Sequence, residues 1–152
     1  MKMLFLLLTV VSMPVFAAGG SLHLDDVDID MSDTASLQRG AGLFVNYCLS
    51  CHSAAYMRYQ RMSEDLQIPK EVVEDNMMFT ADRIGGLMKS TMPADDAKKW
   101  FGKAPPDLSL IARSRGPEWI YTYMRSFYLD DNSPSGWNNV CLLYTSPSPR
   151  DI

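Results

Sequence analysis

Two cysteines and a histidine lie within five residues of one another and can carry the chemistry of this chain. The segment reads Cys48-Leu49-Ser50-Cys51-His52, which is the spacing at which c-type haem is attached. Each thiol can add to one haem vinyl group, and a ring nitrogen of the adjacent histidine can then ligate the iron. The pattern predicts one covalently bound haem c per chain, with Cys48 and Cys51 as thioethers and His52 as axial ligand.

Two other kinds of site share part of this pattern. A Cys-x-x-Cys pair can form half of a zinc site, but the chain has one further thiol, Cys141, and one further imidazole, His23. A redox-active dithiol belongs between a strand and a helix in a strand-rich domain, whereas this sequence is rich in helical patterns. Haem attachment therefore remains the favoured interpretation, and it implies electron transfer in place of stand-alone catalysis.

The N-terminus has the pattern of an export signal. Lys2 supplies a positive charge, residues 3–16 are almost wholly apolar, and Ala17 precedes the expected cleavage site. The apolar run is too short for a good membrane span. We expect residues 1–17 to be a signal peptide, which would deliver the chain to a compartment where thiols oxidise and c-type haem is attached.

Composition describes one acidic domain. The chain has 152 residues, of which 47% are hydrophobic, and a formal charge of −4; loss of Lys2 with the signal makes it −5. This balance argues against a nucleic-acid partner and for a basic one. After residue 17 no apolar run reaches the length of a membrane helix.

Residues 18–35 read as an acidic arm. Asp26, Asp28 and Asp30 alternate, as do the first ligands of a calcium loop, but the required glycine is missing and Leu37 occupies the position of the bidentate glutamate. We expect a solvated arm.

Helical patterns fill most of residues 36–140. Ser36 is the expected cap of a first helix that ends at Cys48 and turns Ala41, Phe44 and Val45 toward the haem. Further helices are expected over residues 70–79, 81–88, 93–101, 107–115 and 117–127, with a loop over 129–140. No alternating strand pattern is convincing, and the predicted fold class is all-α, a c-type cytochrome domain of helices and long loops around a covalent haem.

One helical stripe carries a cation. Leu108, Ile111, Ala112 and Arg115 fall on one face of the helix expected over residues 107–115, so Arg115 is predicted to point toward the apolar side, where it can meet a carboxylate. Arg113 lies off this stripe and is expected to be solvated.

Residues 40–140 resemble the cytochrome c1 family, the haem subunit of ubiquinol–cytochrome c reductase, and most closely its bacterial members. The blocks that carry the resemblance are Cys48 to Tyr59, Thr80-Ala81-Asp82, Met92 to Gly102, Ala104 to Arg115, Trp119 to Tyr123 and Gly136 to Asn139. They occur in family order and cover about two thirds of the chain.

The resemblance implies an electron path from the Rieske iron–sulfur protein to a soluble cytochrome c, beside a cytochrome b subunit. It implies that Arg115 contacts a haem propionate and that Pro105 and Pro106 pack against the ring. It also implies attachment to the periplasmic face of a bacterial inner membrane. The acidic residues would then form a docking surface for the basic cytochrome c.

The family pattern is lost after Val140. Residues 141–152 match neither the segment that carries the family's methionine ligand nor its membrane anchor, so we expect a foreign tail after an incomplete domain at 36–140. Met92 is not the family's ligand position, and no sixth iron ligand is assigned. The alternatives are a soluble periplasmic monohaem cytochrome c and a haem enzyme or sensor with an open iron site.

Overall fold

The computed structural model describes residues 23–133 and 136–139, and these are mostly helical, as predicted. The elements in chain order are α1 (Thr34–Leu43), the π-helix η1 (Phe44–Cys48), β1 (Ala54–Arg58), α2 (Tyr59–Asp65), α3 (Lys70–Asn76), β2 (Leu87–Met88), α4 (Ala94–Phe101), α5 (Ile111–Arg115), α6 (Pro117–Arg125), β3 (Tyr128–Leu129) and β4 (Trp137–Asn138). The predicted signal peptide and the tail after Val140 lie outside the described residues.

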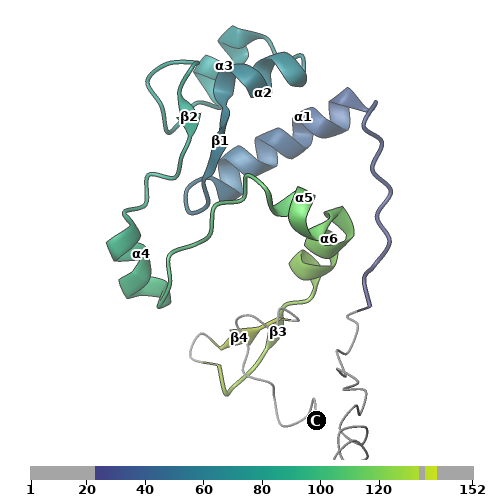
Figure 1. The fold of residues 1–152 in the computed structure, drawn as a ribbon, viewed down its shortest axis with the longest axis vertical. Helices are drawn as coiled ribbons and strands as arrows, with labels where there is room; N and C mark the ends of the chain where they lie inside the picture. The colour runs from purple at the N-terminus through teal and green to yellow at the C-terminus, as the bar shows by residue number, and fades with distance from the viewer. Residues whose placement is uncertain (1–22, 134–135, 140–152) are drawn as a thin grey trace, which may run out of the picture.

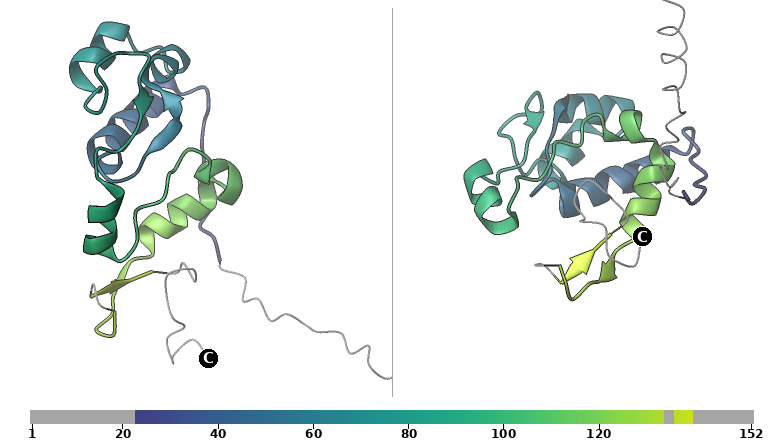
Figure 2. Two further views of the ribbon diagram at one scale, coloured as in Figure 1. Left: turned by 60° about the vertical axis from the view of Figure 1, so that its left-hand side comes forward. Right: turned by 60° about the horizontal axis from the view of Figure 1, so that its bottom comes forward.

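The elements form two groups in space (Figure 1). Helices α1, α2 and α3 gather around the antiparallel pair β1–β2. The second group comprises α4, α5, α6 and the β3–β4 hairpin, of which α5 lies close to α1 and the hairpin lies farthest from it. The views in Figure 2 show the same division, with the acidic arm leading into α1. Among the described residues, no helix combines the length and apolar character needed to cross a bilayer.

The first helix begins earlier than predicted and ends where predicted. Its N-cap is Asp33, whose Oδ1 accepts a hydrogen bond from the Ser36 backbone N–H at 2.9 Å, so the expected cap at Ser36 was wrong by three residues. Beyond Leu43 the helix widens to a π turn, in which Leu49 N–H donates to the Phe44 carbonyl at 3.0 Å. Cys48 closes this helix, as the sequence indicated.

The core lies in the first group of elements. Its fully buried side chains include Leu49, Tyr59 and Val73, and the partly exposed Ala41 and Phe44 pack against it. Although the Tyr59 side chain is buried, its hydroxyl keeps a hydrogen-bond partner, because it shares a hydrogen bond of 2.8 Å with Thr80 Oγ1. Such pairing offsets the cost of burying a polar group.

The helix expected over residues 81–88 is wrong. This stretch forms turns that end in β2, and β2 pairs antiparallel with β1 through Ala54 opposite Met88 and an irregular register toward Arg58. Gly85 and Gly86 weaken a helix here, and a Cβ on Gly86 would approach the Ala81 Cβ to 2.5 Å. The expectation of no strands was therefore also wrong in detail.

The second group was predicted better. Helix α4 follows Pro93 and stops at Gly102, which adopts the left-handed φ of 74° that favours glycine. Helix α6 begins at Pro117, as expected, and ends at Arg125, short of the predicted 127. Part of the expected loop over 129–140 instead forms a hairpin, in which Leu129 pairs with Trp137.

The helix expected over residues 107–115 is reduced to α5, which begins at Ile111. Leu108 therefore lies outside it, and the stripe that was to join Leu108 to Arg115 along one helix does not form. The reason is a hydrogen bond of 2.7 Å from Leu108 N–H to the Ser53 carbonyl, which holds the segment against the start of β1.

The hydrogen bond between Tyr59 and Thr80 predicts that removal of the Tyr59 hydroxyl lowers the free energy of unfolding. Tyr59→Phe should lower the free energy of unfolding by about 1–2 kcal/mol, because Thr80 Oγ1 loses its partner in a half-buried place. The matched control is Tyr56→Phe, since Tyr56 is 78% exposed. Equal urea-unfolding midpoints for Tyr59→Phe and the parent protein would contradict the assignment.

Candidate haem-attachment site

The attachment motif folds as a tight turn at the end of η1. The backbone N–H groups of Cys51 and His52 both donate to the Cys48 carbonyl, at 3.0 and 2.8 Å. Cys48 and Cys51 are free thiols and both are half-buried. The turn therefore keeps two unpaired thiols and an imidazole within one turn of chain, which is the donor set that a covalent haem requires.

The imidazole of His52 is oriented by a residue far along the chain. Its Nδ1 lies 2.8 Å from the carbonyl oxygen of Pro106. Because a carbonyl oxygen can only accept, Nδ1 must be the protonated nitrogen in this contact, and Nε2 keeps its lone pair. A hydrogen bond of this kind, from the ring nitrogen that does not bind the metal, fixes both the tautomer and the ring plane of a metal-binding histidine.

Three further hydrogen bonds hold the segment after Pro106 against the residues that follow His52. They run from Leu108 N–H to the Ser53 carbonyl (2.7 Å), from Ala55 N–H to Asp107 Oδ2 (2.9 Å) and from Tyr56 N–H to Ser109 Oγ (3.1 Å). Together with the His52–Pro106 contact they form what we term the polar zipper, residues 52–56 against 106–109. The zipper determines where the Pro106 carbonyl lies.

Asp107 is the ionised member of the polar zipper. Burial alone would raise the pKa of its carboxyl group, but hydrogen bonds from the Ser109 hydroxyl and from the backbone of Ala55 and Ser109 outweigh that effect and lower the pKa below its ordinary value. The carboxylate is therefore charged at neutral pH, when it accepts these bonds best.

A second connection supports the turn from its other side. Ser90 N–H donates to Ser53 Oγ at 2.9 Å, and Ser90 Oγ donates to the Ser50 carbonyl at 2.7 Å. The same Ser90 oxygen accepts from Met92 N–H at 3.1 Å. Sequence reasoning did not find Ser53 or Ser90, although a hydroxyl residue directly after the motif was a visible signal.

The Cys48 thiol is less acidic than an ordinary thiol. Burial, and secondarily the neighbouring Cys51, raise its pKa. The group therefore stays protonated and neutral at physiological pH, which slows adventitious oxidation.

A cavity of about 400 Å³ lies beside the turn, where α1 and α2 meet β1, β2 and the polar zipper. Ala41 and Phe44 line it, and these belong to the helix face that the sequence predicted to pack beside the ring. A larger open hollow of about 550 Å³ runs along the outer side of α1 past Gly42 and Tyr47. Neither cysteine nor His52 lines either one.

The remaining predicted contacts lie along the same stretch of chain. Pro105 is half-buried and Pro106 is exposed, and Pro106 contributes its carbonyl to His52. Arg115 is exposed, and its guanidinium lies 5.3 Å from the centroid of the Trp119 ring, a contact that the sequence did not reveal. Arg113 is exposed, as expected. No group of three or more metal-binding side chains occurs among the described residues.

A Cys-x-x-Cys-His turn at the end of a helix in a mostly helical domain, with its histidine oriented through Nδ1, is the site of a c-type cytochrome. The sequence profile of the Cytochrome C1 family matches residues 26–146. The chain belongs to the cytochrome c1 family.

Two relatives that are named cytochrome c1 agree with this assignment. The chain is 52% identical to cytochrome c1 of Allochromatium vinosum over 83% of its own length and 52% of the relative's. It is 32% identical to cytochrome c1 of Rhodospirillum rubrum, over 78% of the chain and 52% of that protein. A protein of Nitrosomonas europaea named ammonia monooxygenase gamma subunit is 45% identical over 90% of the chain and 58% of its own length. The chain thus spans about half the length of these relatives.

The polar zipper generates a prediction about Asp107. Asp107→Asn should lower stability at neutral pH by on the order of 1 kcal/mol, because an amide oxygen accepts less strongly than a carboxylate. The folded pKa is lowered, so the carboxylate's contribution is present above its unfolded value of 3.8 and is lost as the pH falls through the folded one. The stability difference should therefore shrink in acid.

The readout is amide hydrogen exchange at Ala55 together with urea unfolding at several pH values. Asp82→Asn serves as the control, because Asp82 is exposed and carries the same charge. If Ala55 exchanged at the same rate in Asp107→Asn and in the parent, the carboxylate would not hold the zipper.

Proposed function

We propose that this chain carries one covalent haem c and transfers single electrons as the cytochrome c1 component of a ubiquinol–cytochrome c reductase. The observation that carries the proposal is the His52 Nδ1 contact of 2.8 Å to the Pro106 carbonyl, beside two free thiols in one turn. Such an orientation is needed to present Nε2 to a metal. Membership of the cytochrome c1 family supports the same conclusion.

Each residue of the turn has a different part in holding the haem. Cys48 and Cys51 would hold it through thioethers, and His52 would supply its Nε2 lone pair to the iron. The Pro106 carbonyl accepts a hydrogen bond from His52 Nδ1–H, and this bond makes the imidazole a stronger ligand for a metal. When bound, the haem supplies the one-electron ferric–ferrous couple, and its potential is set by these ligands and by nearby charge.

The charge near the haem edge is assigned to Arg115. We infer that its guanidinium meets a propionate, while Pro105 and Pro106 pack against the ring. The Trp119 ring beneath the guanidinium supports this role, because a stacked arginine loses less side-chain freedom when it binds a carboxylate.

Membership of the cytochrome c1 family also supports a proposal about the location and partners of the chain. We propose that residues 1–17 export the protein to the periplasmic face of a bacterial inner membrane. The electron would arrive from a Rieske iron–sulfur protein beside a cytochrome b subunit and leave to a soluble cytochrome c. The acidic balance of the chain, −4 overall, supports a basic acceptor.

A soluble shuttle cytochrome and a haem enzyme with an open iron face remain the competing functions. The cytochrome c1 profile and relatives disfavour both. The haem enzyme is separated by assay, since a peroxidase consumes peroxide with a reducing substrate, whereas an electron carrier is reduced and is then reoxidised by cytochrome c.

The test of haem attachment is retention of haem under denaturing conditions. The parent chain, made with haem-attachment machinery, should keep peroxidase stain on a denaturing gel, because thioethers survive unfolding. Cys48→Ala with Cys51→Ala should lose the stain, and Cys141→Ala should keep it as the matched thiol control. An unstained parent, or a stained double variant, would overturn the proposal.

A further inference from the structure

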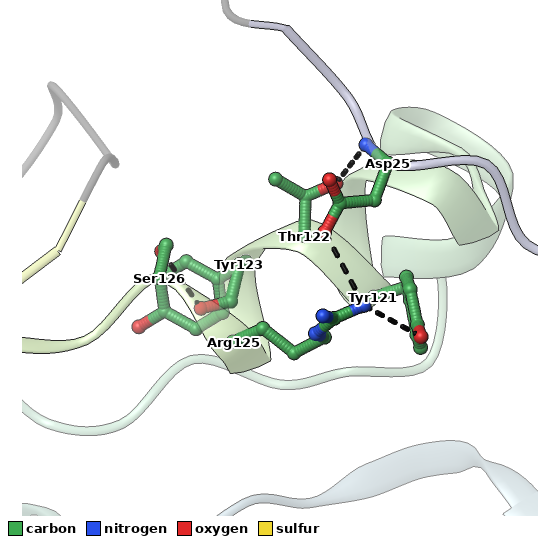
Figure 3. A network of polar contacts seen from close by, with 6 residues as sticks. All are labelled: Asp25, Tyr121, Thr122, Tyr123, Arg125 and Ser126. Carbon is green, nitrogen blue, oxygen red and sulfur yellow. Dashed lines mark hydrogen bonds and ion pairs between the residues drawn. The ribbon is translucent and has the colours of Figure 1, made fainter.

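The acidic arm is tied to the far end of the domain. The backbone N–H of Asp25 donates to Thr122 Oγ1 at 2.8 Å, joining residues 97 positions apart (Figure 3). Thr122 is 8% exposed and is the buried residue of α6. The arm was expected to be solvated along its whole length, and at this point it is not.

A second contact reinforces the first. Arg125 Nη1 lies 3.4 Å from Asp25 Oδ2, and the same guanidinium donates to Tyr121 Oη at 2.7 Å (Figure 3). The ion pair is exposed, so by itself it contributes little to stability. The ion pair does, however, keep the arm on the side of α6 where the buried Thr122 hydroxyl can accept the hydrogen bond from the Asp25 backbone N–H.

The next residue of α6 belongs to an aromatic stack. Tyr123 follows Thr122 directly, and its ring stacks on Trp119 with centroids 5.0 Å apart and planes 8° from parallel. The Arg115 guanidinium covers the Trp119 ring. Arg115 of α5 thus stacks on Trp119 of α6, which stacks on Tyr123, so a shift of α6 moves both rings and with them the surface on which the guanidinium rests.

The junction between the two helices is a glycine. Gly116 separates α5 from α6 with a φ of 88°, a conformation that breaks the helix and favours glycine. Helices α5 and α6 also contact each other directly, and contacts of α6 with other segments of the chain add to what sets its position. The arm provides one, and it continues directly into α1, whose extension η1 ends at Cys48 (Figure 1).

We propose that Asp25 and Thr122 are positioning residues for Arg115. The arm links the helix that carries the haem thiols to the helix whose aromatic stack carries the propionate-binding arginine. It thereby sets how closely the guanidinium approaches the haem edge. This inference rests on the proposed haem function, since the quantity that it controls is the reduction potential.

The sign of the effect separates positioning from simple charge. A cation near the haem favours the ferrous form, so moving Arg115 away lowers the potential. Removing a carboxylate acts oppositely through space and raises it. Thr122→Val changes no charge. Any fall in the reduction potential of the haem in this variant therefore reports a change in the position of Arg115.

The experiment is a spectroelectrochemical titration of the haem-loaded full chain. Thr122→Val should lower the midpoint potential, and Thr122→Ser, which keeps the accepting oxygen, should restore it. Asp25→Asn should also lower it, although the lost charge alone predicts a rise. Asp28→Asn is the matched control, because Asp28 is exposed on the same arm, and it should leave the potential unchanged or slightly raised.

A double-mutant cycle tests the route of the effect. In an Arg115→Gln background, Thr122→Val should cause no further fall. A Thr122→Val protein with covalent haem and the parental potential would overturn the positioning role, as would an equal fall with and without Arg115. Failure of the parent to attach haem would instead refute the proposed function. If Thr122→Val did not fold, Asp25→Asn would decide: a lowered potential would support the positioning role, and an unchanged or raised potential would overturn it.

Discussion

The hydrogen bond between His52 Nδ1 and the Pro106 carbonyl is the contact on which the rest of this structure depends. It joins residues 54 positions apart, so a segment far along the chain orients the imidazole. The chain holds that segment in place with backbone and side-chain bonds around the contact instead of with a larger core. Leu108, Asp107 and Ser109 carry those bonds.

The attachment turn is consequently supported on two sides while its outer surface stays open. The polar zipper holds one side, and Ser90 holds the other through Ser50 and Ser53. The arm adds a longer connection, from α1 to α6. These contacts are mostly polar and lie outside the apolar core, so each can be weakened by a single substitution that leaves that core intact.

The sequence predicted the parts of this arrangement that are local. The helix that ends at Cys48, the start of α4 after Pro93 and the start of α6 at Pro117 all follow from short-range rules. The errors arose where distant residues decide the outcome. Residues 81–88 read as a helix because the pairing of β2 with β1 has no local signature, and residues 107–110 leave their expected helix to bond Ser53 and its neighbours.

The most direct test is whether the Pro106 carbonyl orients the His52 ring. The apo chain, labelled with ¹⁵N in its two histidines and with His23→Gln used for assignment, can be examined at a pH well above the range in which imidazoles titrate. The ¹⁵N shifts of His52 then report which ring nitrogen carries the proton. The account predicts a protonated Nδ1 and a bare Nε2. A proton on Nε2 would mean that the Pro106 carbonyl does not orient the ring, and the proposed haem ligation would lose its structural basis.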